Sequence, residues 1–425
     1  MSSASLFPDL TPVPKPRRRR AHSEIVKSLL RLNEAAQKIN STLELDSLLD
    51  KVVTEVAAMF GCLEISIWLH DWEAEEMVLL GGRGCTVHKK GARLRLGTQG
   101  MIGHVGGTGT MRYAPDVRKD PYYIACEPEI MSEVDIPLVA DGKVIGVFNA
   151  GHTQLDAFSP AQLQMLQSLA DHIAVAIHNA RLFQQERAEK DEARLIQQTL
   201  FPREAPLIRG FTLEGHCVTA GAVGGDWFDY VPLPVHRAGN DRLWGIVLAD
   251  VSGKGMPAAL LMSATRGMLR ALVGSVASPA AVLNRLNRVL IEDFPRERFV
   301  TMIYAVLDPT NRTLTFASAG HPWPVFARNG AVQGLRTSAG LPLGIAESEY
   351  DEHTLELPPG SRVLLYSDGV TDAGECEGNE YGLDRLNQHL LRRDVSAAAI
   401  LQEVSTFCGG GPLCDDATLV LLKAD

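Results

Sequence analysis

Acidic residues recur at four places in the second half of the chain, three of them with neighbouring glycines, and each place lies next to an apolar run. The four segments are residues 224–229, 250–255, 366–369 and 415–418. Carboxylates that gather without a paired Lys or Arg repel and raise one another's pKa, so such a cluster favours a compensating cation. Oxygen ligands select Mg²⁺ or Mn²⁺ over zinc. The pattern predicts a divalent metal centre suited to hydrolysis by an activated water.

Apolar strands must position these acids. Residues 244–249 form an apolar run that ends at Asp250, and residues 362–366 lead to Asp368. Asp415 and Asp416 directly precede a third run, residues 418–422. Any one Asp-Gly pair is more often an ordinary turn. Their recurrence beside successive strands favours the metal centre instead.

Six motifs occur in order over residues 203–425: 224–229, 250–255, 318–322, 340–344, 366–369 and 415–418. Together they resemble the SpoIIE/RsbU branch of the PPM family of metal-dependent protein serine/threonine phosphatases. The resemblance implies an α-β-β-α sandwich with two Mn²⁺ or Mg²⁺ ions between its sheets. It also implies in-line attack of water on phosphorus, without a phosphoenzyme.

The resemblance assigns roles to individual residues. Asp250 matches the carboxylate that bridges both metals, and Val251 matches the neighbour that offers its backbone carbonyl. Asp368 and Asp415 match the remaining ligands of the second metal, while Asp226 matches an acidic position that holds a water or ligates directly. These four aspartates form the expected catalytic set. Residues expected to support them from outside the coordination shell are Asp229, Gly253, Gly369 and Asp416.

His321, in the run Ala-Gly-His-Pro over residues 319–322, is open to two interpretations. It could act as a general acid toward the leaving serine oxygen. We favour a structural His-Pro turn at the end of a strand.

The N-terminal half has a different pattern. Apolar residues at helical spacing predict helices over residues 23–40 and 45–60. Alternating residues 63–69 and 77–80 predict one hairpin, and residues 134–139 and 143–149 predict another around Asp141-Gly142. We expect an antiparallel sheet with its helices on one side.

Ser159-Pro160 starts a further predicted helix that runs to about Thr199. Residues 132–138, the hairpin at 142–147 and residues 176–180 resemble a GAF domain covering residues 23–184. That family implies a sensor of small molecules or proteins that dimerises through its terminal helices. The GAF ligand is not readable from the sequence.

Cys126 is a possible sensor thiol. Its surroundings resemble the region where GAF-type free methionine sulfoxide reductases carry a nucleophilic cysteine. A reductase would also want a resolving thiol, for which Cys85 is the plausible candidate. A half-buried structural thiol in a binding loop is the favoured interpretation.

The segment 185–202 joins the two halves and is rich in Gln, Glu, Lys and Arg. It predicts either a short parallel coiled coil in a homodimer or a solvated helix in a monomer. The expected fold class is α+β, with four parts. These are a disordered basic tail (1–22), a GAF sensor domain (23–184), a helical linker (185–202) and a PPM-type phosphatase domain (203–425).

Composition narrows the choice of partners. The 425 residues include 41 basic and 51 acidic side chains, a net charge of −10 that matches nucleic acid or an anionic membrane poorly. The basic run at residues 15–20 is a local exception that we interpret as a solvated tail. No apolar run approaches the roughly 20 residues needed to cross a bilayer, so we expect a cytoplasmic protein.

The sequence therefore predicts a metal-dependent phosphoserine/phosphothreonine phosphatase switched by its GAF domain. The resemblance implies a phosphoprotein substrate, for which we expect a small anti-sigma-factor antagonist of the STAS type. One alternative is a signalling scaffold that binds a phosphoprotein without turnover. Another is a redox enzyme centred on Cys126.

Overall fold

A computed structural model describes residues 44–236, 242–274, 278–336, 340–374 and 378–425, together with Gln37 and Thr42. The predicted tail (1–22), including the basic run 15–20, and most of the first predicted helix (23–40) lie outside these residues. The chain forms two compact units, Met1–Arg187 and Ala188–Asp425. None of the described helices is both long enough and apolar enough to span a membrane.

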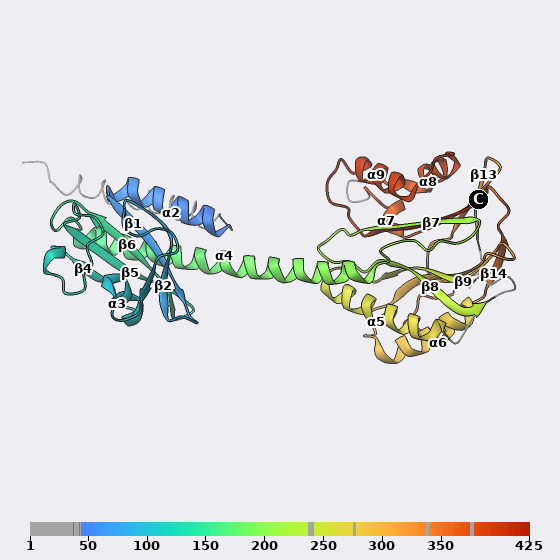
Figure 1. Cartoon of the computed structure of the whole chain (residues 1–425), viewed down its shortest axis with the longest axis horizontal. Helices are drawn as coiled ribbons and strands as arrows, with labels where there is room; N and C mark the ends of the chain where they lie inside the picture. The colour runs from blue at the N-terminus through green and yellow to red at the C-terminus, as the bar shows by residue number, and fades with distance from the viewer. Residues whose placement is uncertain are drawn as a thin grey trace, which may run out of the picture. The chain divides into compact units, whose positions relative to one another are not determined.

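The first unit is built on a six-stranded antiparallel sheet with the order β3-β2-β1-β6-β5-β4 (Figure 1). Both predicted hairpins are present, and the turn residues Asp141 (φ 47°) and Gly142 (φ 72°) adopt the left-handed conformations that such a turn requires. The strands are β1 (Glu64–Asp71), β2 (Glu76–Arg83), β3 (Arg93–Arg95), β4 (Arg112–Ala114), β5 (Ser132–Ala140) and β6 (Lys143–His152).

Helices cover both faces of this sheet, so the expectation of helices on one side was wrong. α2 (Leu45–Phe60) and the start of α4 (Pro160–Leu200) share one core with Ile65 and Ile67 of β1. On the opposite face, α3 (Gly100–Thr108) packs through Val105 against Trp68. The glycine-rich sequence of α3 does not predict a helix, because its glycines are present to allow close packing and not for helix propensity. A Cβ on Gly103 would lie 2.4 Å from the carbonyl oxygen of Arg95.

A short 3₁₀ helix (Val117–Lys119) precedes the segment that carries Cys126. The helix predicted from Pro160 to about Thr199 is α4, whose residues 160–187 belong to the first unit and 188–200 to the second.

The second unit is an α-β-β-α sandwich, which confirms the predicted architecture (Figure 1). Its two antiparallel sheets have the orders β14-β11-β10-β9-β8 and β13-β12-β15-β16-β7. The strands are β7 (Phe211–Val218), β8 (Trp227–His236), β9 (Arg242–Val251), β10 (Val300–Asp308), β11 (Thr313–Ala319), β12 (Val325–Arg328), β13 (Ala331–Gly334), β14 (His353–Glu356), β15 (Arg362–Tyr366) and β16 (Ala417–Ala424).

Three apolar layers hold this sandwich together. The layer between the sheets includes Ile246 and Leu248 of β9, whereas Val247 and Ala249 face the helices α5 (Met256–Val273) and α6 (Pro279–Asp293). The outer face of the second sheet packs on α7 (Asp368–Thr371), α8 (Gly382–Leu391) and α9 (Ala397–Phe407). Because side chains of a strand alternate between faces, Asp250 falls on the side that faces the other sheet.

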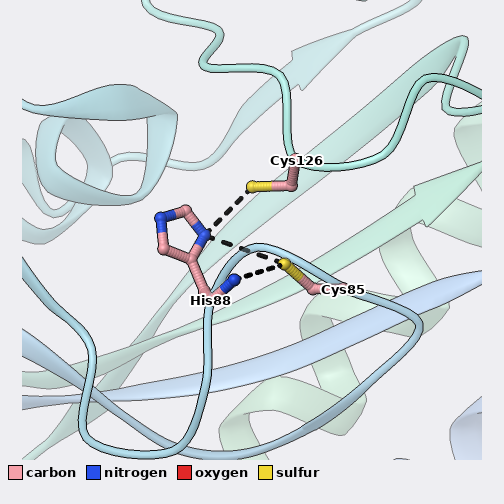
Figure 2. Close-up of side chains that lie close together, drawn as sticks. All are labelled: Cys85, His88 and Cys126. Carbon is pink, nitrogen blue, oxygen red and sulfur yellow. Dashed lines mark hydrogen bonds between the residues drawn. The ribbon is translucent and has the colours of Figure 1, made fainter.

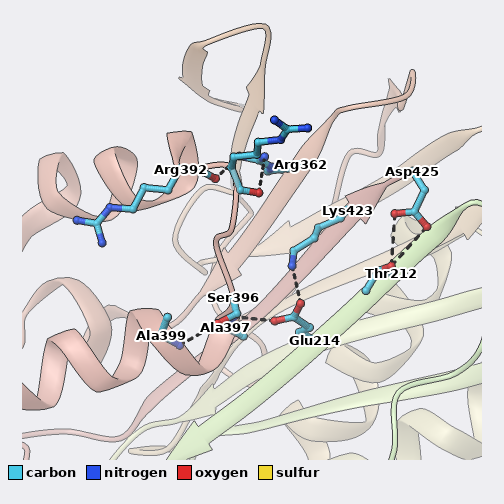
Figure 3. Close-up of polar contacts among 10 residues, drawn as sticks. Thr212, Glu214, Arg362, Arg392, Ser396, Ala397, Ala399, Lys423 and Asp425 are labelled. Carbon is cyan, nitrogen blue, oxygen red and sulfur yellow. Dashed lines mark hydrogen bonds and ion pairs between the residues drawn. The ribbon is translucent and has the colours of Figure 1, made fainter.

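Polar contacts fix α8 and α9 to the second sheet (Figure 3). Glu214 of β7 pairs with Lys423 of β16 at 2.5 Å, and its other oxygen accepts the backbone N–H of Ala397 at 2.9 Å. Ser396 caps α9 by accepting the N–H of Ala399 at 3.2 Å. Arg362 donates to the carbonyl of Arg392 at 2.6 Å, which holds the end of α8. These contacts support β15, which leads to Asp368, and β16, which follows Asp415.

Candidate active site and metal centre

Asp250 and Val251 end strand β9 and form the floor of the predicted site. Asp250 pairs with Thr301 of β10 in the sheet, and Val251 is fully buried. The backbone of Gly225 lies against both residues, because a Cβ there would be 2.6 Å from the carbonyl oxygen of Val251 and 3.4 Å from a carboxylate oxygen of Asp250. A side chain at position 225 would therefore clash with the carbonyl of Val251.

Asp226 lies beside Asp250 on the neighbouring strand. β8 begins at Trp227, which pairs with Ala249, so Asp226 falls opposite Asp250. Asp226 is 1% exposed, and it accepts a 2.6 Å hydrogen bond from the hydroxyl of Ser367. Burial, followed by the charge of Asp250, raises the pKa of the Asp226 carboxyl well above its usual range.

Asp368 and Asp415 come from the other sheet and are exposed. Asp368 opens α7 directly after β15, and Asp415 stands just before β16, the neighbour of β15. Burial, then the charges of Asp368 and Asp415, raise the pKa of Asp250 to about 7. Lys254 pairs with Asp415 at 3.0 Å. The four predicted catalytic aspartates thus meet at one end of the sandwich.

Asp416 holds the loop that carries Asp226. Its carboxylate accepts the backbone N–H groups of Ala220 and Gly225 at 2.8 Å each. A Cβ on Gly224 would lie 2.1 Å from this carboxylate, and one on Gly369 would lie 2.0 Å from the backbone oxygen of Asp416. Asp416 and both glycines therefore fix how the two sheets approach each other around the acids.

Two arginines of α5 form ion pairs with Asp229. Its buried carboxylate pairs with Arg266 at 3.0 Å and with Arg270 at 2.7 Å. These ion pairs anchor α5 to β8.

Gly253 has φ +94°, and a Cβ there would collide with the guanidinium of Arg298, which donates to the carbonyl of Ser252 at 2.6 Å. Asp229 and Gly253 thus contact arginines near the catalytic aspartates, and the sequence motifs did not predict these arginines.

Sequence reasoning also missed two residues that contact the Asp226 loop. Ser367 lies inside a recognised motif, so its position beside Asp368 was the available signal. Gln197 lies at the end of α4, in a polar sequence that carries no signal for a contact with this loop. Its side-chain amide donates to the carbonyl of Gly224 at 2.7 Å and accepts the N–H of Gly224 at 3.1 Å, and Gln197 itself is 6% exposed.

The donor set fits hard divalent cations. Asp226 and Asp250 face each other with raised pKa values, and the carbonyl of Val251, which lies against Gly225, offers a further oxygen. Crowded carboxylates and carbonyls are the ligands that Mg²⁺ and Mn²⁺ prefer. A bound cation would relieve the repulsion that raises these pKa values.

The raised pKa of Asp250 predicts a pH-dependent stability of the metal-free protein. An unfolded Asp titrates near 3.9, whereas folded Asp250 titrates at about 7. Between these values the folded state keeps a proton that the unfolded state has lost, so stability falls as pH rises. In EDTA we expect Asp250→Asn to unfold at a higher temperature than wild type, by a margin that is larger at pH 8 than at pH 5. Calorimetry at both pH values tests this, and an unchanged difference would contradict it.

His321 is placed as a structural residue. Burial lowers its pKa to about 3, and Nδ1 lies 2.8 Å from the hydroxyl of Thr301. A group that stays neutral at physiological pH is a poor proton donor. We expect His321→Gln to keep metal-dependent activity within about threefold, whereas loss of a general acid typically costs about 10²–10⁴-fold. Initial rates at saturating metal decide between the two roles.

The predicted sensor thiol Cys126 lies in the first unit, close to Cys85 and His88. Nδ1 of His88 is 3.0 Å from Sγ of Cys126 and 3.8 Å from Sγ of Cys85. The plausible partner thiol is therefore beside Cys126, and His88 is an addition that the sequence did not suggest.

Comparisons with known proteins match both halves of the chain. The family model for stage II sporulation protein E (SpoIIE) matches residues 240–425, and the GAF domain model matches residues 44–177. The phosphoserine phosphatase RsbU of Bacillus subtilis is 30% identical over 256 residues, which cover 57% of this chain and 72% of that protein.

Two further relatives match parts of the chain. The phosphoserine phosphatase RsbP of Bacillus subtilis is 26% identical over 183 residues, 42% of this chain and 43% of its own length. The free methionine-R-sulfoxide reductase of Saccharomyces cerevisiae is 33% identical over 73 residues, 17% of this chain and 41% of that protein. Taken with the sandwich fold and the RsbU match, the chain belongs to the SpoIIE/RsbU branch of the PPM phosphatases and carries a GAF domain before its phosphatase domain.

Proposed function

We propose that this protein removes phosphate from phosphoserine or phosphothreonine in a protein substrate, under the control of its GAF domain. The observation that carries the proposal is the meeting of Asp226 and Asp250 of one sheet with Asp368 and Asp415 of the other. Members of the PPM family depend on divalent metals. All four acids being retained argues against a scaffold without turnover.

Two Mn²⁺ or Mg²⁺ ions would be held by Asp226, Asp250, the carbonyl of Val251, Asp368 and Asp415. When bound, such ions polarise a phosphoryl oxygen and lower the pKa of a water. The protein itself positions the ligands: Ser367 orients Asp226 by its 2.6 Å hydrogen bond, and Asp416 fixes the adjoining loop. Lys254 places a positive charge beside Asp415, where a phosphate dianion would arrive.

The exposed rim of the site supports a protein substrate. Asp368 and Asp415 are exposed, so a phosphoserine on the surface of another protein can reach the acids. We propose a phosphorylated anti-sigma-factor antagonist of the STAS type, acting in the cytoplasm. The similarity to RsbU, which is named a phosphoserine phosphatase, supports phosphoserine as the group that is hydrolysed.

A second copy of the chain is the proposed partner of α4. Val175 (50% exposed), Leu182 (50%) and Ile196 (60%) recur at multiples of seven residues. This spacing is typical of a coiled-coil seam, which would make the protein a homodimer. Gln197, next to Ile196, touches the Asp226 loop, so a change in the α4 pairing has a direct route to the acids.

The test of the proposed activity uses the purified full-length protein with Mn²⁺, Mg²⁺ or EDTA. The substrates are a phosphoserine peptide and a phosphorylated STAS protein. We expect turnover with metal, none with EDTA, and faster turnover of the STAS protein. Binding of the phosphorylated protein without turnover under every condition would favour the scaffold instead.

GAF control predicts that removing residues 1–184 changes the rate. Allosteric coupling is typically about 5-fold or more, so we expect at least that change in kcat/KM on the STAS substrate. The second unit has its own apolar layers, so we expect the fragment 185–425 to fold by itself and compare it with the full-length protein. Equal rates for the two proteins, with both folded by circular dichroism, would show that the GAF domain does not control the phosphatase.

A further inference from the structure

Two sulfurs and one imidazole nitrogen gather in the first unit, away from the phosphatase acids in sequence (Figure 2). Cys85 and His88 lie in the loop that follows β2, and Cys126 lies in the segment between the 3₁₀ helix and β5. The two Sγ atoms and Nδ1 of His88 are all within 4.8 Å of one another. Figure 2 shows both thiols directed at the same ring nitrogen.

Local contacts hold these three side chains in place. The backbone N–H of His88 donates to Sγ of Cys85 at 3.2 Å, a bond that stabilises negative charge on the sulfur. The backbone N–H of Thr86 donates to the carboxylate of Glu127, which ties together two loops that lie 41 residues apart. The imidazole of His88 packs edge-on against Trp68, with ring centroids 5.5 Å apart.

The surroundings of the cluster are acidic. Glu64 is 6% exposed and lies within hydrogen-bonding reach of Cys85. The charges that act most strongly on Cys126 are those of Glu64, Cys85 and Glu133, all of which are negative when ionised. Such an environment disfavours a free thiolate and favours a bound cation.

We propose that Cys85, His88 and Cys126 bind a borderline-soft divalent cation such as Zn²⁺, with the buried carboxylate of Glu64 as a nearby negative charge. Zinc prefers tetrahedral sets of thiolate, imidazole and carboxylate. Bond lengths of about 2.3 Å to sulfur and about 2.0 Å to nitrogen put neighbouring ligand atoms roughly 3.5–3.8 Å apart. The observed nitrogen–sulfur distances of 3.0 and 3.8 Å need shifts of only a few tenths of an ångström to about half an ångström.

The rival use of the same atoms is a thiol redox pair, in which Cys85 and Cys126 form a disulfide. A disulfide would use only the two sulfurs, whereas Nδ1 of His88 also lies 3.0 Å from Sγ of Cys126 and 3.8 Å from Sγ of Cys85. A cation, by contrast, displaces the thiol protons as it binds. The contacts therefore favour metal binding over thiol catalysis.

The test is a Co²⁺ titration of the reduced full-length protein, followed by its near-ultraviolet absorption. Cobalt bound by thiolates gives a sulfur-to-metal charge-transfer band that the oxygen ligands of the phosphatase site cannot give. We expect one equivalent of Co²⁺ to produce the band and Zn²⁺ to abolish it. Asp250→Asn should keep the band, which separates this site from the phosphatase centre and from any failure of the proposed phosphatase activity.

Three variants complete the test. Cys85→Ser and Cys126→Ser should each lose the band, and Cys62→Ala, which removes a buried thiol outside the cluster, should keep it. Circular dichroism checks that each variant is folded, and His88→Gln replaces any variant that is not. The proposal is overturned if the reduced wild type shows no band, or if the band survives in the folded variants.

Discussion

Replacing Asp250 by Asn is expected to lower metal-dependent hydrolysis by well over 100-fold. Losing a partner that only supports a metal ligand typically costs about 10–100-fold, and Asp250 contributes its carboxylate directly. Asparagine lacks the negative charge through which Asp250 interacts with Asp226, Asp368 and Asp415. Initial rates on a phosphoserine peptide over a range of Mn²⁺ concentrations measure the effect.

A matched control separates this effect from the loss of any one carboxylate in the same unit. Asp394→Asn changes an exposed aspartate of the same unit and should leave the rate unchanged within about twofold. Isothermal titration should show that Asp250→Asn binds Mn²⁺ more weakly than wild type. Full activity of Asp250→Asn at wild-type Mn²⁺ concentrations would remove Asp250 from the metal centre.

The second large effect is expected from Gln197→Leu at the end of α4. Leucine cannot replace the two hydrogen bonds to Gly224, and an unsatisfied buried backbone group costs about 1–3 kcal/mol. The loop would relax toward water and shift Asp226, which lies two residues further along. We expect kcat to fall about 10–100-fold, the range typical for residues that position a metal ligand.

The neighbouring residue provides the control for this variant. Gln198 is exposed on the same helix, so Gln198→Leu should retain wild-type kcat. A positioning role also predicts that Gln197→Leu needs more Mn²⁺ for half-maximal rate, which a simple loss of stability would not cause. An unchanged metal dependence with a lowered melting temperature would show that Gln197 is only structural.

Local patterns predicted the strands and the long helix, because both depend on periodicity that neighbouring residues carry. The strand through residues 244–249 delivers Asp250 because apolar alternation fixes the face of each side chain. The turn at Asp141-Gly142 is likewise a local property, since both residues tolerate a positive φ. Such features need no knowledge of the rest of the fold.

Contacts between distant segments could not be predicted in this way. Asp229 lies in the same motif as Asp226, yet Arg266 and Arg270 neutralise it, and only the packing of α5 on β8 reveals this. Gln197 and Gly224 are 27 residues apart and share no sequence pattern. His88 joins Cys126 across 38 residues for the same reason.

The place of β16 in the second sheet bears on when the enzyme becomes active during its synthesis. β16 lies between β15 and β7, although β7 is made some 200 residues earlier. Until the ribosome has produced Ala417–Ala424, β7 has no neighbour in its sheet, and Asp226 lacks the loop that Asp416 organises. A nascent chain therefore cannot assemble the acids, and dephosphorylation begins only after this strand has emerged.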